Sequence, residues 1–179
     1  MYDYEAQKAD KQIGGLLQPN KTFSRPVQAQ SRIDELFGIA DHAAEQGDWL
    51  EVKKAMQSAE ILDENNVEVH RRLGIALLQM DDHAGAQKHF EAILAADPED
   101  DLAEASLANA LHKLGEDEAA IAHHQRAIEL DATYAPHAYN YANTLYDLDR
   151  KAEALELYRQ AHAIDPQLTQ AQKMIEELD

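Results

Sequence analysis

The chain has 179 residues, of which 34 are acidic and 16 are basic, so its formal charge is −18, and it contains no cysteine. A composition of 45% hydrophobic and 28% charged residues is globular, which argues against a wholly disordered acidic chain. The charge disfavours nucleic-acid binding, because neutralising phosphates requires clustered Lys and Arg. The lack of cysteine excludes disulfides and thiolate chemistry.

Membrane insertion and secretion are also disfavoured by the sequence. No run approaches the roughly 18 apolar residues of a membrane span, and the first residues lack the basic and apolar regions of a signal peptide. We therefore expect a soluble, cytoplasmic protein without membrane partners. The initial Met1 and the charged end at Asp179 suggest a complete chain.

Residues 1–32 differ in charge from the rest of the chain. They carry a net charge of +2 and leave −20 for the remainder. Gly14-Gly15 and Pro19-Asn20 would interrupt a long helix, so we predict an N-terminal arm that is partly helical or disordered. A short helix is expected near residues 3–12 and irregular chain to about residue 26. The arm is either a frayed tail or a segment that docks on an acidic array, its own or a neighbour's.

A period of 34 residues organises the sequence from residue 33 onward. An apolar residue precedes a small one in four equally spaced pairs: Ile39-Ala40, Leu73-Gly74, Leu107-Ala108 and Tyr141-Ala142. A second set of equivalent positions holds Met56, Phe90, His124 and Tyr158. The period therefore divides the chain into four units, 33–66, 67–100, 101–134 and 135–168.

Each unit is expected to form two antiparallel helices. Apolar residues recur every three or four positions in two stretches of each unit. In the break between the stretches, one position always carries a residue that tolerates the left-handed conformation at a helix end: Gly47, Asp81, Gly115 and Asp149. Small residues in the first helix would let the second helix approach closely, and His124 is expected in this core as a structural residue.

The period, the rows of small residues and the aromatics Phe90 and Tyr158 resemble the tetratricopeptide repeat over residues 33–168. The resemblance implies an all-α fold, an α-α superhelix of four helix-turn-helix repeats whose first helices line a concave face. The first unit departs from the family pattern, as terminal repeats commonly do. Residues 169–179 are predicted to form a C-terminal capping helix.

Three asparagines would lie on the concave face that the resemblance implies. Asn109 and Asn143 occupy the same slot in consecutive units, and Asn140 lies one helical turn before Asn143. An Asn amide offers both a donor and an acceptor, which suits the backbone of an extended peptide. Similar asparagines line the peptide grooves of several family members. The alternative is that these amides are merely solvated.

Four further residues are candidates for ligand contact on that face. Tyr139 and Tyr146 should face the groove as exposed aromatic anchors, of the kind found in binding hot spots. His112 and Lys113 lie one turn after Asn109, and His112 would make binding sensitive to pH.

An adjacent arginine pair, Arg71 and Arg72, flanks the expected groove in the second unit. Their planar guanidinium groups either grip a carboxylate of a partner or pair with Glu68 and with acids of the first unit. Some family members clamp a C-terminal carboxylate across three repeats. This chain offers Arg71 and Asn109 for such a clamp, but its other three slots hold Ile75, Pro136 and Asn140. We therefore do not expect that clamp.

Nine histidines raise the question of a metal site. Adjacent His123 and His124 would point in different directions on a helix, whereas His89 and His123 share a slot in successive units and could approach each other. Without cysteine or a fixed carboxylate partner we expect no metal site and no cofactor. The sequence also lacks a phosphate-binding loop and a nucleophile motif, so we expect no enzymatic activity.

The sequence therefore predicts a scaffold or adaptor that binds a protein or peptide in its concave groove. Two alternatives stay open. One is a chaperone for a secreted substrate, because small size, low pI and the arm resemble type III secretion chaperones of translocator proteins. The other is a regulatory repeat module of a glycosyltransferase-like system. Homo-oligomerisation through the N-terminal arm or the convex face also stays open.

Overall fold

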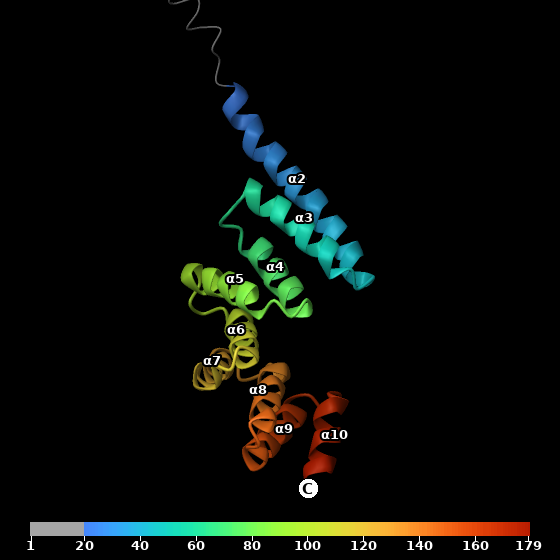
Figure 1. Ribbon diagram of the computed structural model, residues 1–179, viewed down its shortest axis with the longest axis vertical. Helices are drawn as coiled ribbons and strands as arrows, with labels where there is room; N and C mark the ends of the chain where they lie inside the picture. Colours follow the sequence, from blue (N-terminus) through green and yellow to red (C-terminus); the bar gives the residue numbers. More distant parts are fainter. Residues whose placement is uncertain (1–19) are drawn as a thin grey trace, which may run out of the picture.

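The computed structural model describes residues 20–179, which form nine α-helices and no β-strand (Figure 1). The helices are α2 (Asn20–Glu45), α3 (Trp49–Leu62), α4 (Val67–Gln79), α5 (His83–Ala96), α6 (Asp101–Lys113), α7 (Asp117–Leu130), α8 (Ala135–Asp147), α9 (Lys151–Ile164) and α10 (Thr169–Leu178). None of these helices combines the length and the apolar character that crossing a lipid bilayer requires. The predicted all-α fold is confirmed.

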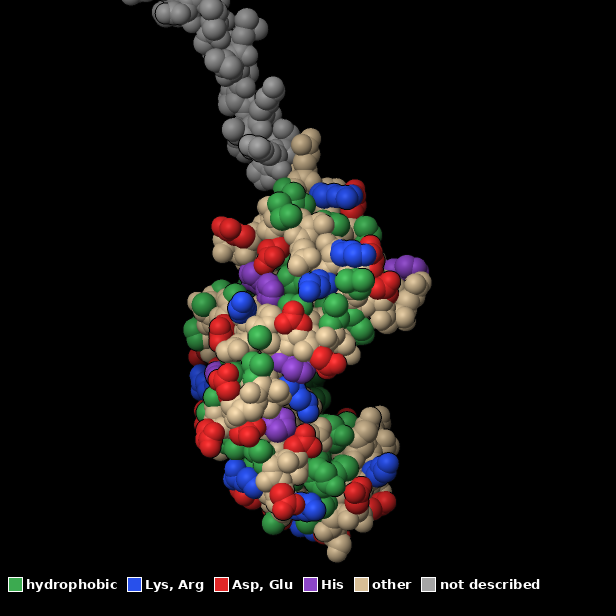
Figure 2. All heavy atoms as spheres, in the orientation of Figure 1, with side chains coloured by type: hydrophobic (Ala, Val, Ile, Leu, Met, Phe, Trp, Pro, Cys, Tyr) green, Lys and Arg blue, Asp and Glu red, His purple; other side chains and the backbone are tan. Residues whose placement is uncertain are grey.

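The helices stack in the order of the chain. Each packs on its neighbours in sequence, while α4 also contacts α6, and α6 contacts α8. Figure 2 shows that the array curves, so that its outline is hollowed on one side between the N-terminal helices and α10. Contacts between successive first helices place their side chains on one continuous surface.

The turns inside the four units have the conformation that the sequence predicts. Gly47 and Gly115 have φ angles of +72° and +80°, and Asp81 and Asp149 have φ angles of +59° and +58°. Only residues that tolerate this region can end a helix in this way. At the starts of α3, α4, α5 and α6, a side-chain oxygen accepts a hydrogen bond from a backbone N–H of the first turn.

Small residues and large residues alternate across each helix pair in the core. Ala40, Gly74, Ala108 and Ala142 are buried, as are the four members of the second set, Met56, Phe90, His124 and Tyr158. Gly74 allows the closest approach, because a Cβ atom there would lie 2.8 Å from Cζ of Phe90. The structural assignment of His124 is confirmed, since its ring is fully buried.

The structure corrects one expectation about the N-terminal arm and shows one exception in the first unit. Helix α2 begins at Asn20, so the prediction of irregular chain as far as residue 26 is wrong for residues 20–26. Of the residues expected to interrupt a long helix, Gly14, Gly15 and Pro19 precede α2 in the sequence, and Asn20 is its first residue. The short helix predicted near residues 3–12 lies outside the described residues. Ile39 is 43% exposed although its counterparts are buried, because α2 packs on one second helix, α3, whereas each later first helix packs on two.

Candidate functional site

A hollow of about 310 Å³ lies where α6 and α8 run side by side, below the turn that joins α4 to α5. It is lined by Leu78, Asp81, His83, Asn109, His112, Lys113, Asn140, Asn143, Thr144 and Asp147. Five of the nine residues predicted for the site are therefore brought together, three from α6 and two from α8. The 34-residue period explains the convergence, because it places equivalent positions of adjacent first helices next to each other.

Asn143 is held in one orientation by the second helix of its own unit. The Tyr158 hydroxyl donates a hydrogen bond of 2.7 Å to Oδ1 of Asn143. Burial raises the pKa of Tyr158, so the hydroxyl stays protonated and remains a donor. With its oxygen engaged in this way, Asn143 presents its two N–H donors to a ligand, where they would bind carbonyl oxygens.

His112 and Lys113 lie in the hollow beside carboxylates. Nδ1 of His112 is 2.8 Å from Asp117 Oδ1, and Nε2 is 3.2 Å from Asp147 Oδ2. Nζ of Lys113 is 3.5 Å from the same Asp147 oxygen. Asp147, at the end of α8, therefore contacts both the ammonium group of Lys113 and the imidazole of His112. A ligand carboxylate would compete with Asp147 for both groups.

Arg71 and Arg72 line a different hollow, of about 250 Å³, formed by α2, α3 and α4. Arg71 donates to both carboxylate oxygens of Asp100, and this hydrogen bonding raises the pKa of Arg71. Arg72 donates to Asp41 and to Glu68 Oε1, the latter over 2.5 Å. Burial opposes the charge of Arg72, but these two carboxylates outweigh it and raise the pKa of Arg72.

Of the two interpretations of the arginine pair, internal pairing is the one that the geometry supports. Asp41 belongs to the first unit and Asp100 caps the first helix of the third, so the two arginines tie three units together. Arg72 also stacks on Phe37, with its guanidinium carbon 4.6 Å from the ring centre.

Tyr139 and Tyr146 are half-buried rather than exposed. Both pack against the core cluster of the last unit, and the Tyr139 ring lies 5.7 Å from the Tyr158 ring. Neither lines the hollow that holds the asparagines. The sequence places them correctly on the first helix of the fourth unit, but both rings pack against a core cluster that side chains of α10 also cover.

The histidines pair differently from the sequence expectation. His123 lies 2.5 Å from Glu104, and His89 lies 3.1 Å from His70, so His89 and His123 each have a partner within their own unit. Within residues 20–179, one group of metal-ligating side chains has its ligand atoms within 4.8 Å of one another: Glu60, His70 and His89. Burial lowers the pKa of His89.

Five residues of the main hollow were not among the nine predicted site residues: Leu78, Asp81, His83, Thr144 and Asp147. The first three lie at the end of α4, in the turn that follows and at the start of α5, whereas the candidates all lie on first helices. The periodic turn position of Asp81 is a signal that could have pointed to them. Thr144 is buried, and its hydroxyl lies 2.9 Å from Nε2 of His124.

Comparison with protein families agrees with this architecture. Family profiles described as tetratricopeptide repeat match residues 71–135 and residues 138–168, together more than half of the chain. The chain belongs to the tetratricopeptide repeat family. The first unit and α2 precede the matched residues, in agreement with the departures of that unit from the family pattern.

Solved tetratricopeptide repeat structures share this fold. MamA is 26% identical over 78% of this chain and 82% of its own, with a TM-score of 0.67. YrrB, described as a TPR protein with an unusual peptide-binding site, is 20% identical over 77% of this chain and 71% of its own, with a TM-score of 0.66. The TPR2B domain of yeast Sti1, in complex with an Hsp70 peptide, is 24% identical over 63% of this chain and 94% of its own, with a TM-score of 0.58. Comparison with curated protein sequences gives no match.

Proposed function

We propose that this tetratricopeptide repeat protein is an interaction scaffold that holds a peptide segment of a partner protein in its concave groove. The observation that carries the proposal is the convergence of Asn109, Asn140 and Asn143 on one hollow of about 310 Å³. Amides from adjacent first helices face this one hollow, and each can donate to and accept from the backbone groups of an extended segment. YrrB and the Sti1 domain, which share the fold, are described as binding peptides.

The proposed mechanism is recognition without chemistry. Asn143 donates to ligand carbonyl oxygens while Tyr158 holds its oxygen, and Asn109 and Asn140 supply further donors and acceptors. Lys113 and His112 favour an acidic group on the ligand, which would displace Asp147. Tyr139 and Tyr146 contribute apolar area at the edge of the groove. Each hydrogen bond contributes about 0.5–1.5 kcal/mol net, so micromolar affinity is expected.

The arginines act in this proposal by shaping the array rather than by gripping ligand. Arg71 is engaged with Asp100, and the other slots of the carboxylate clamp hold Ile75, Pro136 and Asn140. The groove is therefore suited to internal peptide segments rather than to the clamped C-terminal carboxylates that some family members bind.

The double variant Asn109→Ala/Asn140→Ala tests the proposal. It leaves the Asn143–Tyr158 hydrogen bond in place, so the last helix pair keeps its packing. Losing two net hydrogen bonds should weaken binding by about tenfold or more. Partners are captured from the native host with the wild-type chain, quantified by mass spectrometry, and measured again with each variant.

The matched control is Asn65→Ala, which removes an exposed amide from the turn between α3 and α4. It should retain every partner that the double variant loses. Recovery of all partners at wild-type level by Asn109→Ala/Asn140→Ala would refute the groove proposal.

The alternative functions predict their own results in the same capture experiment. A chaperone for a secreted substrate would bind its client there, so the double variant would also release that client. A regulatory module of a glycosyltransferase-like system would be captured together with a catalytic chain. Homo-oligomerisation stays a prediction, which light scattering of the purified chain tests.

A further inference from the structure

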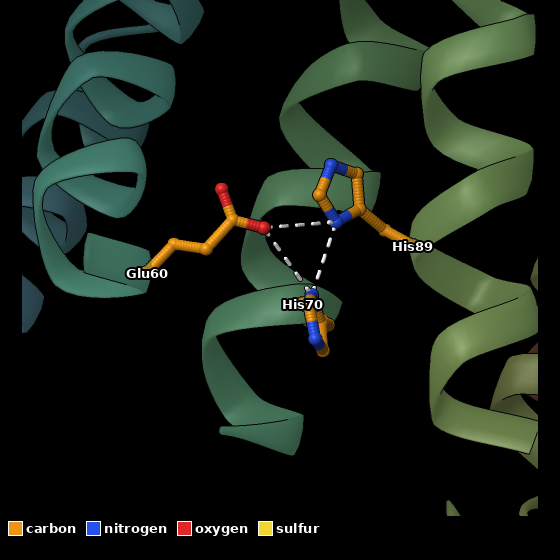
Figure 3. Close-up of side chains that lie close together, drawn as sticks. All are labelled: Glu60, His70 and His89. Atoms are coloured by element: carbon orange, nitrogen blue, oxygen red, sulfur yellow. Dashed lines mark hydrogen bonds and ion pairs between the residues drawn. The ribbon is translucent and has the colours of Figure 1, made fainter. Parts of the chain in front are cut away.

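Three side chains from three helices point toward one another (Figure 3), and none of them lines either hollow. Glu60 comes from α3, His70 from α4 and His89 from α5. The two Nδ1 atoms are 3.1 Å apart, and Oε1 of Glu60 lies 3.7 Å from His70 Nδ1 and 3.8 Å from His89 Nδ1. The three atoms thus form a nearly regular triangle.

The size of this triangle fits one face of a tetrahedral metal site. Zinc bonds of about 2.0–2.2 Å to nitrogen and oxygen place neighbouring ligand atoms about 3.3–3.6 Å apart. The measured edges of 3.1, 3.7 and 3.8 Å lie on either side of that range. Two imidazole nitrogens and one carboxylate oxygen are also a donor set that suits borderline divalent ions such as zinc.

The other repeats show that the fold does not need polar residues here. One period further along the chain, the equivalent positions hold Leu94, Glu104 and His123, and the last two form a pair at 2.5 Å. Another period further, they hold Ile128, Ala138 and Leu157, which are all apolar. The second unit is therefore the one whose equivalent positions, together with Glu60 from the first unit, supply three ligand atoms.

Without a cation the cluster is poorly satisfied. Two facing Nδ1 atoms can share one proton in a single hydrogen bond, and Glu60 is too distant to hydrogen-bond either ring. A bound divalent ion would accept lone pairs from both rings and would neutralise the carboxylate.

The cluster is also accessible to an ion from solvent. The side chains of His70, His89 and Glu60 are 12%, 18% and 34% exposed. The exposed side leaves a coordination position for water, as in sites with three protein ligands.

We propose that Glu60, His70 and His89 bind one divalent transition-metal ion, with zinc as the expected occupant. The ion would fasten the first helix pair to the second, since α3 provides one ligand and α4 and α5 provide the others. The first pair contacts the rest of the array chiefly through the α3–α4 interface, with Arg72 of α4 adding contacts to Asp41 and Phe37 of α2. A metal bond across that interface would stabilise the end of a repeat array, where such arrays open most easily.

The test uses the full chain without a histidine tag, titrated calorimetrically with zinc chloride in a non-chelating buffer. The variant Glu60→Ile/His70→Ala/His89→Leu introduces the residues found two periods later in the chain, Ile128, Ala138 and Leu157. The wild-type chain should bind one equivalent of zinc, and the triple variant should bind more than about 100-fold more weakly. An unchanged titration for the triple variant, or a wild-type Kd weaker than about 1 mM, would overturn the proposal.

The matched control is Glu104→Ala/His123→Leu, which makes the same kind of change one period later. It should bind zinc as the wild type does, and loss of binding in this control would also contradict the assignment. Cobalt in place of zinc supplies a readout that needs no variant. Its absorption should be that of a four- or five-coordinate ion, and a spectrum of the hydrated ion would count against the site.

Stability measurements test the proposed role of the ion. Zinc should raise the Tm of the wild-type chain by several degrees and slow amide hydrogen exchange in α3 and α4, and excess EDTA should reverse both effects. The triple variant should show neither response. The metal cluster and the asparagine hollow share no residue, so zinc binding and peptide capture can fail independently.

Discussion

His124 is a polar residue at a position that holds Phe90 and Tyr158 in neighbouring units. Its ring is fully buried, stacks on Tyr141 with a centroid separation of 5.4 Å, and shares a 2.9 Å hydrogen bond with Thr144. Burial, followed by repulsion from nearby histidines, lowers the pKa of His124 to about 3. The folded protein therefore holds this imidazole neutral.

This burial predicts a contribution of His124 to acid unfolding. The unfolded imidazole has a pKa of about 6.5, so between that pH and about 3 the unfolded state binds a proton that the folded state does not. Stability from this residue is fully present above pH 6.5 and is lost as the pH falls toward 3. In His124→Phe, the free energy of unfolding should depend less on pH in this range, by up to about 1.4 kcal/mol per pH unit.

Urea unfolding of His124→Phe at several values between pH 4 and 7 measures this slope. His42→Gln removes an exposed histidine and serves as the control that keeps the wild-type slope. If His124→Phe and the wild type have parallel profiles, the ring titrates normally and the assignment fails.

At the scale of a helix pair, packing depends on how closely the two axes approach. In α4 and α5 the approach is set by Gly74 beneath the buried ring of Phe90. A Cβ atom at Gly74 would lie 2.8 and 2.9 Å from two ring carbons, although the other units hold Ala at this position. In the second unit, glycine in place of alanine thus allows the Phe90 ring to lie closer to the first helix.

The variant Gly74→Ala should therefore destabilise the protein, although Ala is the better helix former. Overpacking of a closed core costs about 1–3 kcal/mol, which exceeds the gain of about 0.5–1 kcal/mol from removing a helical glycine. Gly38→Ala in α2 is the control, because no atom lies within 4 Å of the added Cβ and only the gain remains. In chemical denaturation, the unfolding midpoint should fall for Gly74→Ala and rise for Gly38→Ala. A shift of both midpoints in the same direction would contradict this account.

At the scale of the whole molecule, contacts run between neighbouring helices along the chain. Arrays of this kind open locally, because each unit is stabilised chiefly by its own packing and by the units beside it. The C-terminal end is closed by α10, whose Ala171 is fully buried in a cluster with Ala138 and Ala161.

The variant Ala171→Glu should detach α10 and loosen only the end of the array. An unpaired carboxylate in this cluster costs about 2 kcal/mol or more, so hydrogen exchange should accelerate in α8, α9 and α10. Exchange in α4 and α5 should stay at the wild-type rate. Gln170→Glu adds the same charge at an exposed position of α10 and should leave exchange unchanged. Faster exchange throughout the molecule would indicate a single cooperative unit instead.

The acidic residues behind the net charge of −18 are distributed unevenly over the molecule. Several acidic residues stand in the turns, where Asp48, Asp82 and Asp100 accept hydrogen bonds from helix N-termini. The main hollow, by contrast, combines amides with Lys113, His112 and two aspartates. Much of the acidity thus serves helix ends and solvation, which leaves ligand selection to fewer side chains.

The repeat, its 34-residue period, the left-handed turn positions and the core rows were determined by the sequence alone. These features depend on local periodicity and backbone preference, and the same pattern recurs in every unit. The convergence of Asn109, Asn140 and Asn143 also followed, because equivalent positions of stacked repeats lie side by side.

The tertiary structure alone decided which side chains of different helices meet. The pairing of Arg71 with Asp100, the hydrogen bond that orients Asn143, and the meeting of Glu60 with His70 and His89 join residues 10 to 29 positions apart. The period specifies which positions are equivalent, but it does not specify how far each side chain reaches or which neighbour satisfies it. Those outcomes depend on the separation of particular helices, which the packing of large and small residues sets.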